Sequence, residues 1–475
     1  AESVAFSRDG NFAFVLFNVD GGYGFRGALA RFYAIFAECF ERRLDTHGAW
    51  MPFADISAIE GFEDFGFVFH EGAVHDQFNA DHGIGNYRYT EPSTWWMDMP
   101  DGMERSAEDV DRMIREYAAG DDEKYKLSAQ VTLASVAYDE HGHMQYQSRD
   151  LPWCHGVCFS SNPNPNLPEP CEGRTLLWND ADRAMLYGPD TPGLQAGEYL
   201  DSLEAYATEA ENHRRDHFRH VTIPLTFSRE SKSPCIHKAF SVFEFCKVLA
   251  GDLHAMDKAL FCNSAPERYA FLTPFFDVMG IEVEWVGHEG EWVDPGDDVC
   301  NFKRAMMATR PYALLLNTPF EKLTPPIVER YFQRSLFYGF LPSMFSHNAA
   351  EDIYWGKPEW YNRDRHFFLK YAPMCREVSE AGWQVLTHAR SDNPAIALER
   401  FGTDGAIYLT LLNTSATDQQ AAVTLDTAAL GVDLAGPLTD DISGATIPLT
   451  HSAGEATLTI SLAAECATRL TLRSK

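Results

Sequence analysis

Two acidic residues follow short apolar segments and have the chemistry of a catalytic pair. The segment GEYLDSLEAY runs from apolar residues into Asp201, and FFDVMGIEVEW presents Glu282 and Glu284 after Gly280. Side chains alternate along a strand, so Glu282 and Glu284 lie on the same side and compete for one role, for which we prefer Glu282. The structural alternative for Asp201 is to cap a helix that follows it.

A pair of carboxylates on facing strands is suited to cleaving a glycosidic bond. One carboxylate attacks the anomeric carbon or activates water, and the other, with a raised pKa, protonates the departing oxygen. We predict that Asp201 is the nucleophile and Glu282 the acid/base of a retaining double displacement. Retention and inversion differ in the distance between the two carboxylates, which a sequence does not contain, so inversion stays open.

Two further acidic residues, Glu71 in FHEG and Glu91 in YTEPSTWW, are candidates for the same site. Glu91 is followed by Trp95 and Trp96, whose aromatic faces can stack on sugar rings or pack in a hydrophobic core. We predict that these four residues contact the substrate and that Glu91 is the substitute catalytic acid. The alternative for Glu91 is to position substrate or to form a salt bridge.

Polar side chains near other strand ends complete the predicted substrate site. Sugar hydroxyls are bound by such donors and acceptors, so we add Arg229, Asn263, Glu284, Trp285 and His347. An Asn side chain also fixes loops through nearby backbone groups, which is the structural alternative. Arg229 and Lys232 form a small basic island that favours an anionic sugar, sulfated or carboxylated, with salt bridges as the alternative.

The sequence offers little support for a metal or another cofactor. His213 and His217 have the spacing of a zinc-binding helix, but HRRDH lacks the glutamate of HExxH. Among ten cysteines, only Cys154 and Cys158 lie close together, so the four-ligand zinc pattern is absent. GxSxG is absent too, which disfavours a serine hydrolase. We therefore expect no metal and no cofactor.

The elements that must position these residues alternate between apolar runs and helical stretches across roughly 300 residues. This alternation predicts an α/β fold, and polar residues at the strand ends favour a (β/α)8 TIM barrel. Nine runs compete for eight strand positions; AWMPF at 49–53 is the first. FGFVFHEG lies too close to IGNYRYTEP for a full helix between them, so we expect one of these two to be a loop or hairpin.

The two ends of the chain have a different pattern from the middle. Beyond about residue 393, short segments alternate with period two between turn residues, which predicts a small antiparallel β-sandwich. NFAFVLFNVD, at 11–20, predicts an isolated strand. We therefore expect a remnant or edge strand of an N-terminal β region in 1–26, a catalytic barrel in 27–390 and a C-terminal β-sandwich in 391–475.

Composition excludes several classes of partner. The 475 residues include 69 acidic and 39 basic side chains, for a net charge of −30, which repels nucleic acid and anionic membranes. No apolar run has the length of a membrane-spanning helix. The acidic surface suits a secreted or periplasmic protein, and an oligo- or polysaccharide is the expected substrate. The oligomeric state is not predicted.

Several of these segments together resemble a known class of enzyme. YLDS with Asp201, DVMGIEVEW with Glu282, and YFQRSLFYGFLPSMFSHN resemble glycoside hydrolases that have a (β/α)8 barrel and a C-terminal β-sandwich, over residues 40–475. In barrel glycosidases of the α-galactosidase type, the nucleophile follows strand four and the acid/base follows strand six. With AWMPF as strand one and IGNYRYTEP as strand two, the resemblance implies these roles for Asp201 and Glu282.

Two other functions remain open at the level of sequence. The first is a non-catalytic carbohydrate-binding protein on a barrel scaffold, although a binder gains little from acids that face neutral hydroxyls. The second is a polysaccharide lyase or an inverting hydrolase that uses Glu91.

Overall fold

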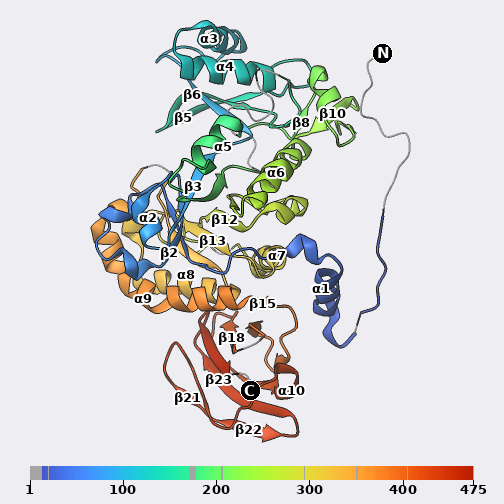
Figure 1. The fold of residues 1–475 in the computed structure, drawn as a ribbon. Helices are drawn as coiled ribbons and strands as arrows, with labels where there is room; N and C mark the ends of the chain where they lie inside the picture. The colour runs from blue at the N-terminus through green and yellow to red at the C-terminus, as the bar shows by residue number, and fades with distance from the viewer. Residues whose placement is uncertain are drawn as a thin grey trace. The chain divides into compact units, whose positions relative to one another are not determined.

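The computed structural model describes most of the chain (Figure 1). The described residues are 13–19, 21–168, 170, 178–204, 207–293, 295–348, 351–403 and 405–473. Contacts divide the chain into two compact units, of which the first comprises 1–15, 71–80 and 85–276, and the second 16–70, 81–84 and 277–475. Asp201 and Glu91 belong to the first unit and Glu282 to the second.

Eight strands form one sheet, and their order in the sheet is their order along the chain. They are β1 (Ala49–Pro52), β2 (Phe67–Glu71), β3 (Gly85–Thr90), β7 (Gln195–Leu200), β11 (Ala259–Cys262), β12 (Val278–Val283), β13 (Tyr312–Leu316) and β14 (Leu341–Met344). The pairs β3–β7, β7–β11, β12–β13 and β13–β14 are parallel. The edge strands β1 and β14 contact each other. This topology confirms the predicted TIM barrel.

Helices precede the later strands of this sheet. They are α5 (Asp180–Tyr187), α6 (Lys238–Ala255), α7 (Asp297–Met307) and α8 (Pro325–Tyr338), and α9 (Pro358–Ala381) follows the last strand, β14. Helix α8 shows the sequence signals plainly: Pro325 starts it, and Gly339 ends it in the left-handed conformation, with φ 71°. All five residues of β13 are buried, as expected for a parallel strand covered on both faces.

The apolar run FGFVFHEG, which was left out when the barrel strands were numbered, is a barrel strand. FGFVFHEG contains β2, and the five-residue helix α2 (Gln77–Asp81) is enough to connect it to β3. The surplus run is GVCFSSNP, whose first five residues belong to β6 (Cys154–Ser160). It pairs antiparallel with β4 (Thr94–Asp98) and β5 (Tyr146–Leu151) in a separate sheet. The two errors cancel, so Asp201 still follows the fourth barrel strand, and Glu282 is the last residue but one of the sixth.

Two connections of the first unit carry structure of their own. Helices α3 (Ala107–Ala119) and α4 (Glu123–Ser135) share a hydrophobic core with the β4–β6–β5 sheet. The connection from β7 to α6 holds β8 (Glu211–Asn212), β9 (Thr226–Phe227) and β10 (Pro234–His237), which form a three-stranded sheet. Each insertion follows the carboxyl end of a barrel strand, where the candidate site residues lie.

The C-terminal part of the second unit is the expected β-sandwich. One sheet contains β15 (Trp383–Gln384), β17 (Ile396–Phe401), β18 (Ala406–Asn413) and β24 (Ala467–Arg473), and the other contains β16 (Ala389–Ser391), β19 (Gln419–Asp426), β23 (Glu455–Leu462) and β22 (Leu449–Ser452). A core of buried Leu, Ile and Val residues from both sheets holds them together.

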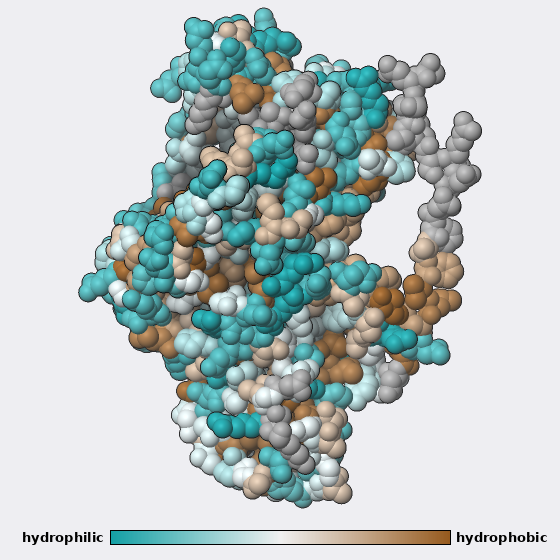
Figure 2. All heavy atoms as spheres, viewed as in Figure 1, coloured by the Kyte–Doolittle hydropathy of each residue, from teal (hydrophilic) through white to brown (hydrophobic). Residues whose placement is uncertain are grey.

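The segment before helix α1 (Gly24–Ile35) differs from the expectation. Residues 13–19 form neither helix nor strand, whereas a strand was expected at 11–20; a strand needs a neighbour to share its backbone hydrogen bonds. Figure 2 shows hydrophobic residues along this segment; Leu16 of the segment and Phe25 of α1 are exposed. Among the described helices, none combines the length and apolar character that a membrane span requires.

Candidate active site

Strand register in the first unit sorts side chains onto two faces. Tyr89 of β3 is paired with Tyr199 of β7, and Tyr199 with Phe261 of β11. The rings of Tyr89 and Tyr199 stack with centroids 5.6 Å apart, and the edge of Phe261 meets Tyr199 at 5.0 Å. Because side chains alternate along a strand, the residues two positions further on continue this aromatic face. Those residues are Glu91, Asp201 and Asn263.

The opposite face of the same strands is occupied by a buried ion pair. Arg88 Nε donates to Glu198 Oε2 at 2.7 Å, and Tyr187 Oη of α5 donates to Glu198 Oε1 at 2.7 Å. Burial raises the pKa of Glu198 to about 7, although Arg88 opposes this. Since Tyr187 belongs to a helix, this acid faces the helical layer. It therefore has a structural role.

Asp201 is held by four neutral donors at the end of β7. Tyr89 Oη donates to Oδ2 at 2.8 Å, and Asn263 Nδ2 donates to Oδ1 at 2.8 Å. The hydroxyls of Ser202 and Tyr199 donate at 3.1 and 3.4 Å. Residues 202–204 are not helical, so within the described residues Asp201 does not cap a following helix. These four donors orient the carboxylate, and none of them carries a positive charge.

Glu91, just beyond the end of β3, has a different environment from Asp201. Trp96 Nε1 donates to Glu91 Oε2 at 2.9 Å. Burial raises the pKa of Glu91 and the charge of Asp201 raises it further, whereas hydrogen bonds from Thr94, Trp96 and Ser202 lower it, and the net shift is upward. Neighbouring carboxylates with such different surroundings are suited to separate roles, one as acid and the other as anion.

One hydroxyl links the two carboxylates. Tyr89 Oη lies 2.8 Å from Asp201 Oδ2 and 3.4 Å from Glu91 Oε2, so the separation of these carboxylate oxygens cannot exceed the sum of the two distances. Inverting glycosidases need roughly 6.5–9.5 Å between the carboxyl groups to fit a water molecule, and retaining ones roughly 5–5.5 Å. The two carboxylates are therefore close neighbours within the first unit.

Glu71 acts electrostatically on the same hydroxyl. It is the last residue of β2 and is only 3% exposed. Burial raises the pKa of Tyr89, and the charges of Asp201, Glu91 and Glu71 raise it further. Tyr89, which the sequence reasoning missed, therefore lies within electrostatic range of all three acids. Counting back two residues from Glu91 would have indicated it.

The two tryptophans of β4 lie on opposite faces of that strand. Trp96 contacts Glu91, and its ring meets the edge of Trp153, which is 43% exposed, at 5.9 Å. Trp95 instead stacks on Phe159 at 5.9 Å within the core of the β4–β6–β5 sheet. Trp95 is partly buried against this core, and alternation directs it away from the acids, which favours the packing alternative for it.

In the second unit, Glu282 is accompanied by an amide at the end of the next strand. Asn317 Nδ2 donates to Glu282 Oε2 at 2.7 Å. Lys303 Nζ of α7 lies 5.7 Å from the ring centroid of Tyr312, so Tyr312 faces the helical layer. Because side chains alternate along a strand, Asn317, five residues later, faces away from that layer. Glu284 is exposed beyond the end of β12. Glu282 is thus held near the end of β12, and its catalytic role stays a prediction.

Two other predicted substrate contacts of the second unit lie in different surroundings. Trp285 is 4% exposed and packs between Tyr331 and Trp292 at 5.7 and 6.1 Å, so the expectation of a sugar-binding face there is wrong. A ring buried between other rings has no free surface for a sugar. His347 is exposed after β14, with its ring 5.5 Å from that of His288.

Arg229 lies in the turn between β9 and β10, and it is exposed. Lys232 Nζ donates to the backbone carbonyl of Arg229. The pocket that Arg229 lines has a volume of about 340 Å³, and five acidic residues share its wall with His141 and His213: Asp139, Glu140, Glu209, Glu211 and Glu230. Such a lining repels an anionic sugar, which weakens the reason for expecting one here.

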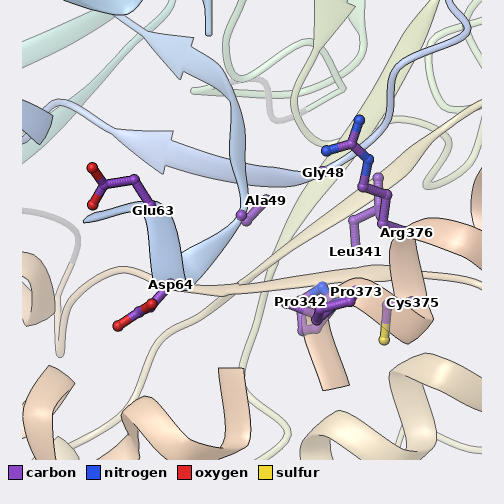
Figure 3. A pocket seen from close by; sticks show the side chains of 11 residues that line it. Gly48, Ala49, Glu63, Asp64, Leu341, Pro342, Pro373, Cys375 and Arg376 are labelled. Carbon is purple, nitrogen blue, oxygen red and sulfur yellow. The ribbon is translucent and has the colours of Figure 1, made fainter. Parts of the chain in front are cut away.

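Another pocket belongs to the opposite end of the barrel strands. Its lining includes Ala49 and Leu341, the first residues of β1 and β14, together with Glu63, Asp64 and Arg376, and its volume is about 190 Å³ (Figure 3). In barrel enzymes, the chemistry takes place at the carboxyl ends of the strands, and the amino ends serve stability. This pocket is therefore not the candidate site.

Comparison with known proteins identifies no family. No protein-family model and no curated protein matches the chain. Similar solved structures include Amy13B of Eubacterium rectale (8% identity, TM-score 0.47, covering 91% of this chain and 96% of that one) and an α-amylase of Geobacillus thermoleovorans in complex with acarbose (12%, 0.44, 96% and 95%). A third is the maltogenic α-amylase AmyB of Thermotoga neapolitana (10%, 0.43, 95% and 94%). With TM-scores below 0.5, these similarities assign neither family nor activity to this chain.

Proposed function

We propose that this protein is a retaining glycoside hydrolase that acts on an oligo- or polysaccharide. The observation that carries the proposal is the Tyr89 hydroxyl, which lies within reach of both Asp201 and Glu91 at the carboxyl ends of neighbouring barrel strands. Two carboxylates this close, one oriented by neutral donors and one with a raised pKa, have the properties that a double displacement requires.

The first step forms a covalent intermediate. The Asp201 carboxylate attacks the anomeric carbon while the glycosidic bond breaks, and protonated Glu91 gives its proton to the departing oxygen. The raised pKa of Glu91 keeps the proton on this acid before the step. Asn263, Ser202 and Tyr89 hold the nucleophile in one orientation, which reduces the entropy lost on reaching the transition state.

The second step releases the sugar. Glu91, now ionised, takes a proton from a water molecule, whose oxygen attacks the anomeric carbon as the bond to Asp201 breaks. The sugar leaves with its original anomeric configuration, Asp201 is again a carboxylate, and Glu91 again carries a proton. The cycle needs no other reactant.

Glu282 is the competing acid/base. It is the predicted one from strand position, and its carboxylate is held by Asn317. We favour Glu91 because its raised pKa and its short distance to Asp201 both come from contacts within one unit. The two assignments predict different results when Glu91 or Glu282 is replaced by glutamine.

We further propose that the substrate is neutral. Three acids act electrostatically on Tyr89, and five acidic residues line the pocket beside Arg229, so a sulfated or carboxylated sugar would meet repulsion at both. Trp153, exposed and in edge contact with Trp96, offers an aromatic surface for a sugar ring next to the acids.

The test is digestion of a panel of neutral, sulfated and carboxylated glycans, with product anomers followed by NMR. We expect Asp201→Asn to lower turnover at least roughly 100-fold, since a catalytic carboxylate contributes several kcal/mol to barrier lowering. The parent should give the retained anomer first. Binding without cleavage across the panel, or an unsaturated product, would replace this proposal by a carbohydrate-binding protein or by a lyase.

The same panel distinguishes the two acids. Loss of a general acid slows cleavage of an ordinary glycosidic bond by roughly 10²–10⁴-fold. A nitrophenyl glycoside, whose leaving group needs no proton, is affected much less. We expect this selective loss for Glu91→Gln, with Glu282→Gln as the matched comparison. The reverse result would assign the acid/base to Glu282.

A further inference from the structure

Three different metal-ligand types meet on the small sheet within the connection from β7 to α6. Glu211 and His213 are two residues apart, so both project to the same side of the strand containing β8. Strand β10 pairs with β8 so that Ile236 is opposite Asn212 and His237 opposite Glu211. The same antiparallel register places Cys235 opposite His213, and directly opposed residues share a face of a sheet.

The ligand atoms of these residues are close enough to share one ion. A carboxylate oxygen of Glu211, a ring nitrogen of His213 and the sulfur of Cys235 all lie within 4.8 Å of one another. His213 Nε2 is 3.3 Å from Glu211 Oε2. Tetrahedral zinc with bonds near 2.1 Å sets nitrogen and oxygen ligands roughly 3.4 Å apart, so this pair already has the spacing of two zinc ligands.

The atoms of His213 and Glu211 that face away from the shared point also have hydrogen-bond partners. His213 Nδ1 lies 3.3 Å from Ser233 Oγ, and Glu211 Oε1 accepts a hydrogen bond from the backbone N–H of Arg229 at 3.4 Å. Contacts of this kind orient metal ligands from behind. They direct His213 Nε2 and Glu211 Oε2 toward each other.

A pocket borders the cluster. Glu211 and His213 line the pocket of about 340 Å³ beside Arg229, with His141, Asp139 and Glu140 elsewhere on its wall. Cys235 is fully buried, whereas the side chains of His213 and Glu211 are 10% and 25% exposed. An ion bound by the three would have one side toward the pocket, where water can supply a fourth ligand.

His217, the other histidine of HRRDH, does not take part. It is buried in the 3-10 helix η5 (Arg215–His220), where its Nε2 lies 2.9 Å from the carbonyl oxygen of Ala134 and its Nδ1 contacts Asn162 and Asn212. The spacing of His213 and His217 therefore has no metal-binding meaning here. The partners of His213 come instead from β8 itself and from β10.

We propose that Glu211, His213 and Cys235 bind one divalent transition metal ion, with zinc as the best match to this mixed set of ligands. The ion would cross-link β8 and β10 within the connection that begins at Asp201 and ends at α6. The site does not depend on the proposed glycosidase activity. Its expected effect is to stabilise this connection.

The test is a titration of the whole metal-free protein with Co²⁺, whose bond to a thiolate gives an ultraviolet charge-transfer band. We expect saturation at one ion per chain, displacement by Zn²⁺, and a rise in the melting temperature with either ion. Cys235→Ser should lose the band. His213→Gln and Glu211→Gln should bind at least roughly tenfold more weakly, because each loses one ligand.

Matched controls keep the proposal falsifiable. His220→Gln changes a histidine on the same connection, and Cys466→Ser changes a cysteine of the β-sandwich; both should bind Co²⁺ like the parent. Circular dichroism identifies any variant that does not fold, and the melting temperature of the parent with and without chelator gives an answer without mutation. The proposal is overturned if the parent shows no thiolate band, or if Cys235→Ser retains it.

Discussion

Replacing Trp96 by phenylalanine tests whether Glu91 is the catalytic acid. The indole Nε1 donates to Glu91 Oε2 at 2.9 Å, and this hydrogen bond lowers the pKa of Glu91 against the upward effects of burial and of Asp201. Phenylalanine keeps an aromatic ring but has no donor. The pKa of Glu91 must therefore rise in Trp96→Phe.

The size of the rise follows from the strength of one hydrogen bond to a charged acceptor. Such a bond contributes about 1.5–3 kcal/mol, and one pKa unit corresponds to about 1.4 kcal/mol. The full effect would be about 1–2 units. Glu91 is partly accessible, so water replaces part of the lost bond, and we expect a rise of about one unit.

The assay is the pH dependence of kcat for a glycan identified in the panel. A general acid must be protonated, so activity falls as the pH rises through its pKa, and the alkaline limb of the profile should move upward in Trp96→Phe. Trp95→Phe is the matched control, because Trp95 lies on the opposite face of β4 and stacks on Phe159. An unchanged or lowered alkaline limb in Trp96→Phe would refute the assignment of Glu91.

Three other substitutions test the remaining assignments. Tyr89→Phe removes the donor to Asp201, and we expect kcat to fall by roughly 10–100-fold, as for the loss of a hydrogen bond worth about 1.5–3 kcal/mol; a change within twofold would contradict the role of Tyr89. Glu198→Ala leaves Arg88 without its main partner and should lower the free energy of unfolding by about 3 kcal/mol in urea titrations, with kcat per folded molecule kept. Trp285→Ala should cost about 3–5 kcal/mol of unfolding free energy, as for other buried tryptophans, and unchanged stability with a raised KM would restore its role as a sugar-binding face.

The sequence was informative where the signal is local. Apolar runs that alternate with helical stretches predicted the barrel, and short segments with period two predicted the sandwich. Both patterns are local, because they reflect which faces of a strand or helix are covered. Asp201 and Asn263 could be found as polar residues at the ends of apolar runs, and the structure joins them at 2.8 Å. Strand alternation placed Glu282 and Glu284 on the same side, so it did not choose between them.

The tertiary structure decided which strands are neighbours. GVCFSSNP and FGFVFHEG are both apolar, but the first pairs within a small antiparallel sheet and the second within the barrel. The sequence of a short buried strand is similar in both kinds of sheet, so it does not identify the neighbouring strands. The same reason explains Trp95 and Trp285, since a tryptophan beside an acid belongs to a core or to a cleft according to distant chain segments.

The composition of the sites depended on the same long-range pairing. Tyr89 meets Asp201 because β3 and β7 are paired although more than a hundred residues separate them in the chain, and Cys235 meets His213 through the register of β8 and β10. Burial and the charge of Asp201 then raise the pKa of Glu91. A sequence specifies residue types and local faces, whereas distances and pKa values arise only when the fold removes water and brings remote groups together.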